Sequence, residues 1–180
     1  MRRIIIFVLF ITTGVSIANE RDIKLDRLFD DLKNLNSKLT YETEQQIWKI
    51  WSTHPNKNNL TLMLSEGSNL VKNNQLYEAV QIFTKVIALD PKWAEAWNKR
   101  ATVLYLLGEF QRSQDDIDKV LELEKRHFGA LSGQGLVQTA MKNYQKAIDS
   151  YIEAHKVYPA METPLMMIER LKDIIKKESI

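Results

Sequence analysis

The chain has 180 residues, with 25 basic and 23 acidic side chains, and it contains no cysteine. The lack of cysteine excludes disulfides, thiolate metal sites, iron–sulfur clusters and cysteine nucleophiles. Arg2 and Arg3 are the only charged residues among the first eighteen, so the rest of the chain has 23 charges of each sign (25 − 2 basic against 23 acidic) and a formal net charge of zero. This balance gives no support for nucleic acid or an anionic membrane as a partner.

Residues 1–18 have the features of a secretory signal peptide. The two arginines precede an uninterrupted apolar run at 4–11, and Ser16 and Ala18 supply small residues at the two positions that a signal peptidase inspects. As a helix, residues 4–18 span roughly 22 Å, short of the ~30 Å hydrocarbon core, which favours cleavage over the alternative of an uncleaved membrane anchor. The sequence therefore predicts cleavage after Ala18, export to a bacterial periplasm and no membrane contact afterwards.

Residues 19–59 contain two apolar patterns of helical spacing. The first consists of Leu25, Leu28, Phe29 and Leu32, and the second of Ile47, Trp48, Ile50 and Trp51. The sequence predicts an N-terminal helical pair that packs against the start of the region that follows. Its tryptophans indicate an interface, because burial of each removes a large apolar area from water.

Three windows of 34 residues follow, at 60–93, 94–127 and 128–161, and their equivalent positions hold residues of the same kind. Position 8 is small in each window, with Gly67, Ala101 and Gly135, and position 24 is large, with Phe83, Ile117 and Tyr151. Small residues let two helices approach closely, and large ones fill the space between neighbouring pairs. Helix exits are expected at Asn73 and Asn74, at Leu107 and Gly108, and at Lys142 and Asn143.

This pattern resembles the tetratricopeptide repeat (TPR), a helix–turn–helix of 34 residues. The resemblance covers residues 60–161 and departs at Lys125, where Pro91 and Pro159 end the other windows. Residues 19–59 could be a degenerate fourth repeat, although their spacing to the first window is off by two. Residues 162–180 have one polar face and are expected to form a capping helix. The resemblance implies an all-α, TPR-type right-handed α-solenoid with an N-terminal helix pair and a C-terminal capping helix.

The resemblance also implies a concave wall made by the first helix of each repeat. Hydroxyl, amide and amine groups on this wall suit hydrogen bonding to a peptide backbone. The candidate binding residues are Asn98, Thr102 and Tyr105, with Ser68, Lys72 and Ser132 beside them. The alternative is a solvated wall without a ligand. Some members of the family clamp a C-terminal carboxylate with several lysines, an arginine and asparagines, but only Asn98 and Lys72 are suitable here, so this clamp is not expected.

Position 7 of the repeat, usually leucine in the family, is polar in all three windows: Glu66, Arg100 and Gln134. We expect a structural polar ladder in which Arg100 pairs with Glu66 and hydrogen-bonds Gln134. Such a ladder would fix the register of neighbouring repeats, and a buried pair of this kind is costly to break.

Catalysis is not expected. His54, His127 and His155 are the only histidines, none has a second metal ligand at helical spacing, and each is expected at the surface or in a turn. Gly129, Gly133 and Gly135 follow no predicted strand and precede no GKS/T sequence, so they do not indicate a phosphate loop. No catalytic residue, metal or cofactor is predicted.

The sequence therefore favours a non-enzymatic protein- or peptide-binding scaffold or adaptor in the bacterial cell envelope, with its partner in the concave groove. Two alternatives stay open. One is a self-associating structural module with Trp48, Trp51 or Trp93 at a homomeric contact, and the other is an accessory subunit of an envelope enzyme complex.

Overall fold

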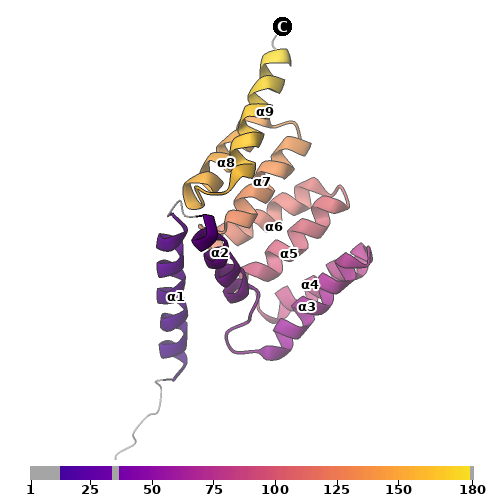
Figure 1. Ribbon diagram of the computed structural model, residues 1–180. Helices are drawn as coiled ribbons and strands as arrows, with labels where there is room; N and C mark the ends of the chain where they lie inside the picture. The colour runs from indigo at the N-terminus through magenta and orange to yellow at the C-terminus, as the bar shows by residue number, and fades with distance from the viewer. Residues whose placement is uncertain (1–12, 34–36, 179–180) are drawn as a thin grey trace, which may run out of the picture.

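The computed structural model describes residues 13–33 and 37–178, which form nine α-helices and no strand (Figure 1). In chain order these are α1 (Thr13–Leu32), α2 (Ser37–Trp51), α3 (Asn58–Lys72), α4 (Leu76–Leu89), α5 (Ala94–Leu106), α6 (Phe110–Leu123), α7 (Phe128–Ala140), α8 (Tyr144–Val157) and α9 (Glu162–Glu178). The predicted all-α fold is confirmed.

Most of the predicted signal peptide, residues 1–12, lies outside the described residues, and residues 13–18 belong to the start of α1. Within the described part of the chain, no helix is both long enough and apolar enough to cross a membrane. Cleavage after Ala18 and export stay predictions.

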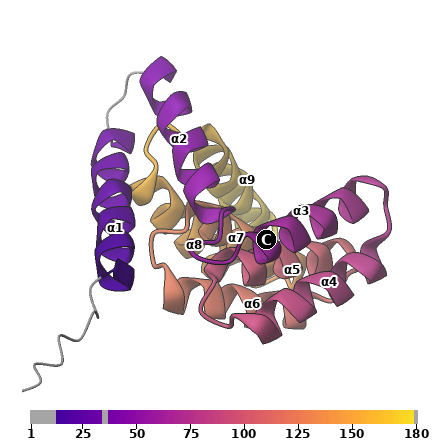
Figure 2. The ribbon, with the colours of Figure 1, turned by 90° about the horizontal axis from the view of Figure 1, so that it is seen from below.

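Three helix pairs form the array: α3 with α4, α5 with α6, and α7 with α8 (Figures 1 and 2). The second helix of each pair also packs against the first helix that follows, so α4 contacts α5, α6 contacts α7 and α8 contacts α9. Helix α9 ends the array by packing Ile168 and Leu171 against Ala147, Ile148 and Tyr151 of α8. Each pair is thus covered on both sides by its neighbours, apart from the outer face of the first.

The turn inside each pair has the same backbone shape. Asn74, Gly108 and Lys142 occupy position 15 of the three windows and have φ values of 59°, 77° and 61°. The residue after each of these three donates its backbone N–H to the carbonyl of the residue five positions before it. At the first turn, for example, Gln75 donates to Leu70 at 2.9 Å. This is a Schellman-type helix end, for which a left-handed residue is needed. The helix exits predicted from Asn, Gly and Lys-Asn lie at these turns.

Close approach within two of the pairs depends on glycine. A Cβ atom at Gly67 would lie 2.5 Å from the ring of Phe83, and one at Gly135 would lie 2.5 Å from the ring of Tyr151. Both rings are fully buried. The small residue at position 8 and the large one at position 24 are therefore in direct contact in the first and third pairs.

We expect Gly135→Ala to lower the free energy of unfolding by about 1–3 kcal/mol, because the new methyl group would have to displace the buried Tyr151 ring. Gly133→Ala, on the same helix, is the matched control. Its Cβ would meet only Ile117, at 3.7 Å, so the gain in helix propensity of about 0.5–1 kcal/mol should show as stabilisation. Urea unfolding followed by circular dichroism measures both. Equal effects of the two substitutions would contradict the close packing at Gly135.

The N-terminal helices α1 and α2 pack against each other and then across the edge of the array. Their shared core joins Leu28, Phe29 and Ile47 to Phe128 at the start of α7 and Tyr158 after α8. At the other end of α2, the Trp51 carbonyl accepts a hydrogen bond from Nε1 of Trp93 at 2.8 Å. Helix α2 thus lies along the loops that join the three repeats.

This placement differs from the sequence prediction in two respects. The pair does not stack in line on α3 and α4 as a fourth repeat would, and it reaches the third repeat as well as the first. Trp51 and Trp93 are buried in these internal contacts and Trp48 is partly buried. Trp51 and Trp93 are therefore not available for a homomeric contact while the pair is docked, and the alternative of self-association stays a prediction.

Candidate functional site

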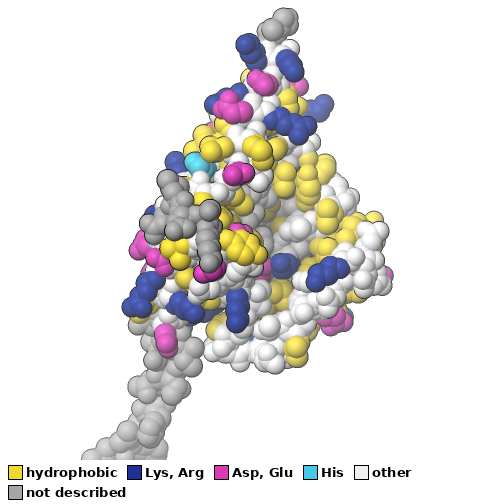
Figure 3. Space-filling model, in the orientation of Figure 1, with side chains coloured by type: hydrophobic (Ala, Val, Ile, Leu, Met, Phe, Trp, Pro, Cys, Tyr) yellow, Lys and Arg dark blue, Asp and Glu magenta, His cyan; other side chains and the backbone are white. Residues whose placement is uncertain are grey.

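The first helices α3, α5 and α7 line the inner face of the array, and this face is hollowed in the space-filling view (Figure 3). A hollow of about 60 Å³ lies between α5 and α7. Asn98, Thr102 and Tyr105 line it from α5, Gly129, Gly133 and Leu136 line it from α7, and Ser113 and Ile117 of α6 form part of its wall. Gly133 leaves this space open, because an added Cβ there would meet only Ile117, at 3.7 Å. The three main candidate binding residues therefore meet at one place.

The other predicted groove residues lie away from this hollow. Ser68 on α3 donates its hydroxyl to the carbonyl of Leu64 at 2.9 Å. The hydroxyl of Ser132 on α7 lies 3.6 Å from the sulfur of Met161, and Lys72 is exposed in the last turn of α3. They belong to neighbouring parts of the array and do not extend the hollow.

Asn98 and Thr102 are already engaged within the protein. The amide of Asn98 donates to Oε2 of Glu95 at 3.0 Å, and the hydroxyl of Thr102 donates to the Asn98 carbonyl at 3.0 Å. Asn98 is only 8% exposed. The side chains that a ligand could reach most easily are therefore Thr102, Tyr105 and Leu136, since Thr102 and Leu136 are exposed and Tyr105 is half-buried.

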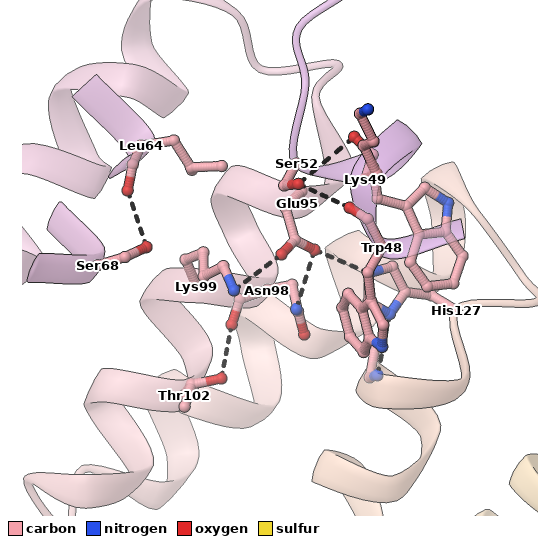
Figure 4. A network of polar contacts seen from close by, with 12 residues as sticks. Trp48, Lys49, Ser52, Leu64, Ser68, Glu95, Asn98, Lys99, Thr102 and His127 are labelled. Atoms are coloured by element: carbon pink, nitrogen blue, oxygen red, sulfur yellow. Dashed lines mark hydrogen bonds and ion pairs between the residues drawn. The ribbon is translucent and has the colours of Figure 1, made fainter. Parts of the chain in front are cut away.

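A buried polar network lies beside the hollow, where α2 meets α5 and α7 (Figure 4). Glu95 and His127 have fully buried side chains, and Nε2 of His127 lies 3.1 Å from Oε2 of Glu95. The other oxygen of Glu95 lies 3.1 Å from Nζ of Lys99. The His127 ring stacks on Trp51, with centroids 4.0 Å apart and planes at 8°. One network thus links the N-terminal pair to two repeats.

Backbone contacts decide the tautomer of His127. Its Nδ1 accepts the N–H of Ala130 at 3.1 Å, which caps the start of α7. The ring proton is therefore on Nε2, which donates to Glu95. His54 repeats this arrangement in the loop before α3: Nδ1 accepts the N–H of Lys57 at 3.0 Å, and Nε2 bonds Asp90 at 2.8 Å.

The histidines were expected at the surface or in turns. His54 and His127 do lie in turns, but they are buried rather than at the surface. Glu95 is likewise buried, with 1% of its surface exposed. The available signal was the place of His127 directly before a helix, where a side-chain acceptor can cap it. A histidine is a less common cap than Ser, Thr, Asp or Asn, so this signal was weak.

The polar ladder has different partners from those predicted. Arg100 forms two bonds of 2.8 Å to Asp116 of α6 and one of 3.1 Å to Thr84 of α4. Gln134 likewise reaches Asp118 of α6 and Ser150 of α8. Position 7 of a first helix therefore bonds the second helices on either side, sixteen residues away in both directions.

Glu66, the third member of the predicted ladder, is exposed on α3 and does not pair with Arg100. The Arg100 side chain instead bonds the second helices α4 and α6 on either side of it. Arg100 and Gln134 do form polar contacts that link neighbouring repeats. The predicted direct pairing of Arg100 with Glu66 and Gln134 was wrong.

The two histidine–carboxylate contacts make stability depend on pH. Burial opposes ionisation of Glu95 and Asp90, but the hydrogen bonds from His127 and His54, with nearby positive charge, outweigh it. The pKa of each carboxyl therefore lies below its ordinary value of 4.5 for Glu95 and 3.8 for Asp90. The stabilisation is complete above these unfolded values and is lost as the pH falls through them towards the lower folded values.

We therefore expect the free energy of unfolding to fall as the pH drops from about 5 to about 3. Urea midpoints over this range measure it. Glu95→Gln removes one of the two titrating groups, so its midpoint should change less with pH than that of the wild type. A slope unchanged by Glu95→Gln would show that Glu95 does not contribute.

The arrangement of the helices defines the class of protein to which the chain belongs. Helix pairs of one period, stacked so that their first helices line a hollowed face, form an α-solenoid built from repeats. No family model matches the chain. A TPR repeat-containing protein of Rhizobium etli is 28% identical over 151 residues, which covers 83% of this chain and 74% of that protein.

A second curated relative and a solved structure are also similar to the chain. Hsp70-Hsp90 organizing protein 1 of Glycine max is 32% identical over 114 residues, 63% of this chain and 20% of the relative, so the chain spans about a fifth of that protein. The structure of the first TPR of Spaghetti bound to an HSP90 peptide has a TM-score of 0.63 and 18% identity, and covers 65% of this chain and 93% of that one. The chain therefore has an all-α fold of the tetratricopeptide repeat type.

Proposed function

We propose that the chain is a non-enzymatic scaffold of the bacterial cell envelope that binds a protein or peptide segment on its inner face. The observation that carries this proposal is the hollow between α5 and α7. It has hydrogen-bonding groups on Thr102 and Tyr105 and apolar walls at Ile117 and Leu136. A backbone can bond the polar groups while one small apolar side chain enters the space.

The similar TPR of Spaghetti, which is bound to an HSP90 peptide, supports a peptide as the partner. The chemistry here favours an internal segment of the partner over a C-terminal carboxylate. Of the two wall residues suited to such a clamp, Asn98 already donates to Glu95, and Lys72 lies outside the hollow. Lys99 is also engaged, because it pairs with Glu95 at 3.1 Å.

Helix α2 forms the rim of this site. The ring of Trp48 lies against Gly129, where an added Cβ would be 2.6 Å from Cη2. Lys99 of α5 lies over the same ring, 5.9 Å from its centroid. The N-terminal pair therefore borders the groove, and its position sets how wide one end of the site is.

Panning a phage-displayed library of random linear peptides on the purified chain tests the proposal. We expect peptides that bind the wild type to be lost with Thr102→Arg, which places a long charged side chain in the hollow. Gln81→Arg on the exposed side of α4 is the matched control and should keep them. Failure to enrich any peptide, or equal loss with both variants, would overturn the groove assignment.

The envelope location rests on residues 1–18 alone. Fractionation of cells that express the full chain, followed by mass measurement, tests it. A periplasmic product that begins at Asn19 is the expected result, and an unprocessed cytoplasmic chain would contradict it.

A further inference from the structure

A second concave site lies between α1 and α2, on the other side of α2 from the groove. Its volume is about 520 Å³. Its walls are formed by one turn of α1, the last turns of α2 and the loop before α3. The lining residues are Glu20, Arg21, Lys24, Gln46, Lys49, Ile50, Thr53, His54 and Pro55. A space of this size can hold a small-molecule ligand.

Positive charge gathers at this place in a chain that is otherwise balanced. Arg21 and Lys24 lie one turn apart on α1, and Lys49 faces them from α2; Glu20 is the single carboxylate among the lining residues. None of these three cations forms an ion pair within the described residues. Dark blue side chains are visible over the lower part of α1 and α2 in Figure 3.

Arg21 differs from the other partly buried arginines. Arg100 has Asp116, and Arg126 has both Glu124 and Asp26 as carboxylate partners. Arg21 is half-buried and donates one Nη2–H to the carbonyl of Ile50 at 3.0 Å. Burial lowers the pKa of Arg21 below its ordinary value, and the charges of Asp22 and Glu124 only partly oppose this. The guanidinium is thus oriented by the end of α2 and stays charged without a salt-bridge partner.

We propose that this pocket binds a phosphate group. A guanidinium with two ammonium groups suits the double negative charge and the several acceptor oxygens of phosphate better than a single carboxylate. Gln46 and Thr53 add neutral hydrogen-bonding groups, and Ile50 and Pro55 provide an apolar floor for the rest of the ligand. The source is either a soluble phosphorylated molecule or the headgroup of a phospholipid.

Titration calorimetry with pyrophosphate and with ADP tests the soluble source. Co-sedimentation with phosphatidylcholine vesicles, with and without phosphatidylglycerol, tests the lipid source. Binding in either arm is expected for the wild type. It should weaken about tenfold or more in Arg21→Gln, since a charge-assisted hydrogen bond is lost, and also in the double variant Lys24→Gln, Lys49→Gln.

Lys24 and Lys49 are exposed, so the double variant keeps the test valid if Arg21→Gln does not fold. Lys85→Gln, Lys146→Gln, at exposed positions on the second helices α4 and α8, is the control of equal charge change and should bind as the wild type does. Absence of binding in both arms, or binding that the Lys24, Lys49 variant retains, would overturn the proposal. The phage selection on the inner face is independent of this result.

Discussion

Replacing His127 with alanine is expected to lower the free energy of unfolding by about 2–4 kcal/mol, because the buried Glu95 carboxylate loses one hydrogen-bond donor and α7 loses its cap. The carboxylate of Glu95 is fully buried and receives the Nε2–H of His127. Without that donor, only Lys99 and Asn98 remain beside it. The same substitution also removes the cap of α7 at Ala130 and the ring stacked on Trp51.

The measurement is urea unfolding at pH 7, followed by far-ultraviolet circular dichroism and by tryptophan fluorescence. His155→Ala is the control, because His155 is half-buried on α8 and makes no ion pair with Glu95. We expect the control to change stability by less than about 1 kcal/mol. Similar midpoints for the two variants would show that the network contributes little.

The two probes also separate local from global effects. Trp48 and Trp51 lie on α2, where His127 contacts both rings. If the N-terminal pair detaches before the repeats unfold, the fluorescence transition of His127→Ala should precede the circular dichroism transition. Coincident transitions would show that α1 and α2 unfold together with the array.

The repeats were predictable because their signal is local and occurs three times. A small residue at position 8 opposite a large one at position 24, such as Gly135 and Tyr151, describes a contact within one helix pair. The turn at position 15 was also visible, although only Gly108 among its three residues is glycine. Asn74 and Lys142 adopt the same left-handed conformation, which shows that the packing of each pair dictates the turn.

The contacts between distant segments were not predictable in the same way. Trp51 meets His127 and Trp93 across more than forty residues of sequence, and nothing in the period of 34 specifies where a preceding helix pair docks. The aromatic residues of α2 indicated an interface but not its partner. For the same reason the buried state of Glu95, which needs α2, α5 and α7 together, could not be seen from α5 alone.

The candidate site was predicted in part. Asn98, Thr102 and Tyr105 do line one hollow, because residues spaced by four and then three positions lie on one face of α5. Their availability was not predictable, since Asn98 is engaged by Glu95 through a contact three residues away on the same helix. The position of a residue in the repeat predicts which face of the helix it lies on. Its hydrogen-bond partner depends on the side chains that pack beside it, which the position does not specify.

Arg100→Ala is expected to lower the free energy of unfolding by about 3 kcal/mol. The guanidinium makes two bonds of 2.8 Å to Asp116, and the side chains are only 16% and 6% exposed. It also bonds Thr84 of the preceding repeat and lies 5.0 Å from the centre of the Trp97 ring. Removing it leaves the Asp116 carboxylate buried without a cation and breaks a link between two repeats.

A double variant distinguishes the cost of that orphaned charge from the value of the pair itself. Arg100→Met with Asp116→Leu replaces both partners by apolar groups, and such replacements of buried pairs are often neutral or stabilising. We expect it to recover most of the stability that Arg100→Ala loses. Full recovery with an unchanged urea dependence would mean that apolar packing can hold the repeats in register as well as the pair does. If the double variant instead unfolds less cooperatively than the wild type, the Thr84–Arg100–Asp116 row has a role in fixing how the first repeat stacks on the second. The apolar pair would then restore the buried contacts but not the single arrangement of the two repeats.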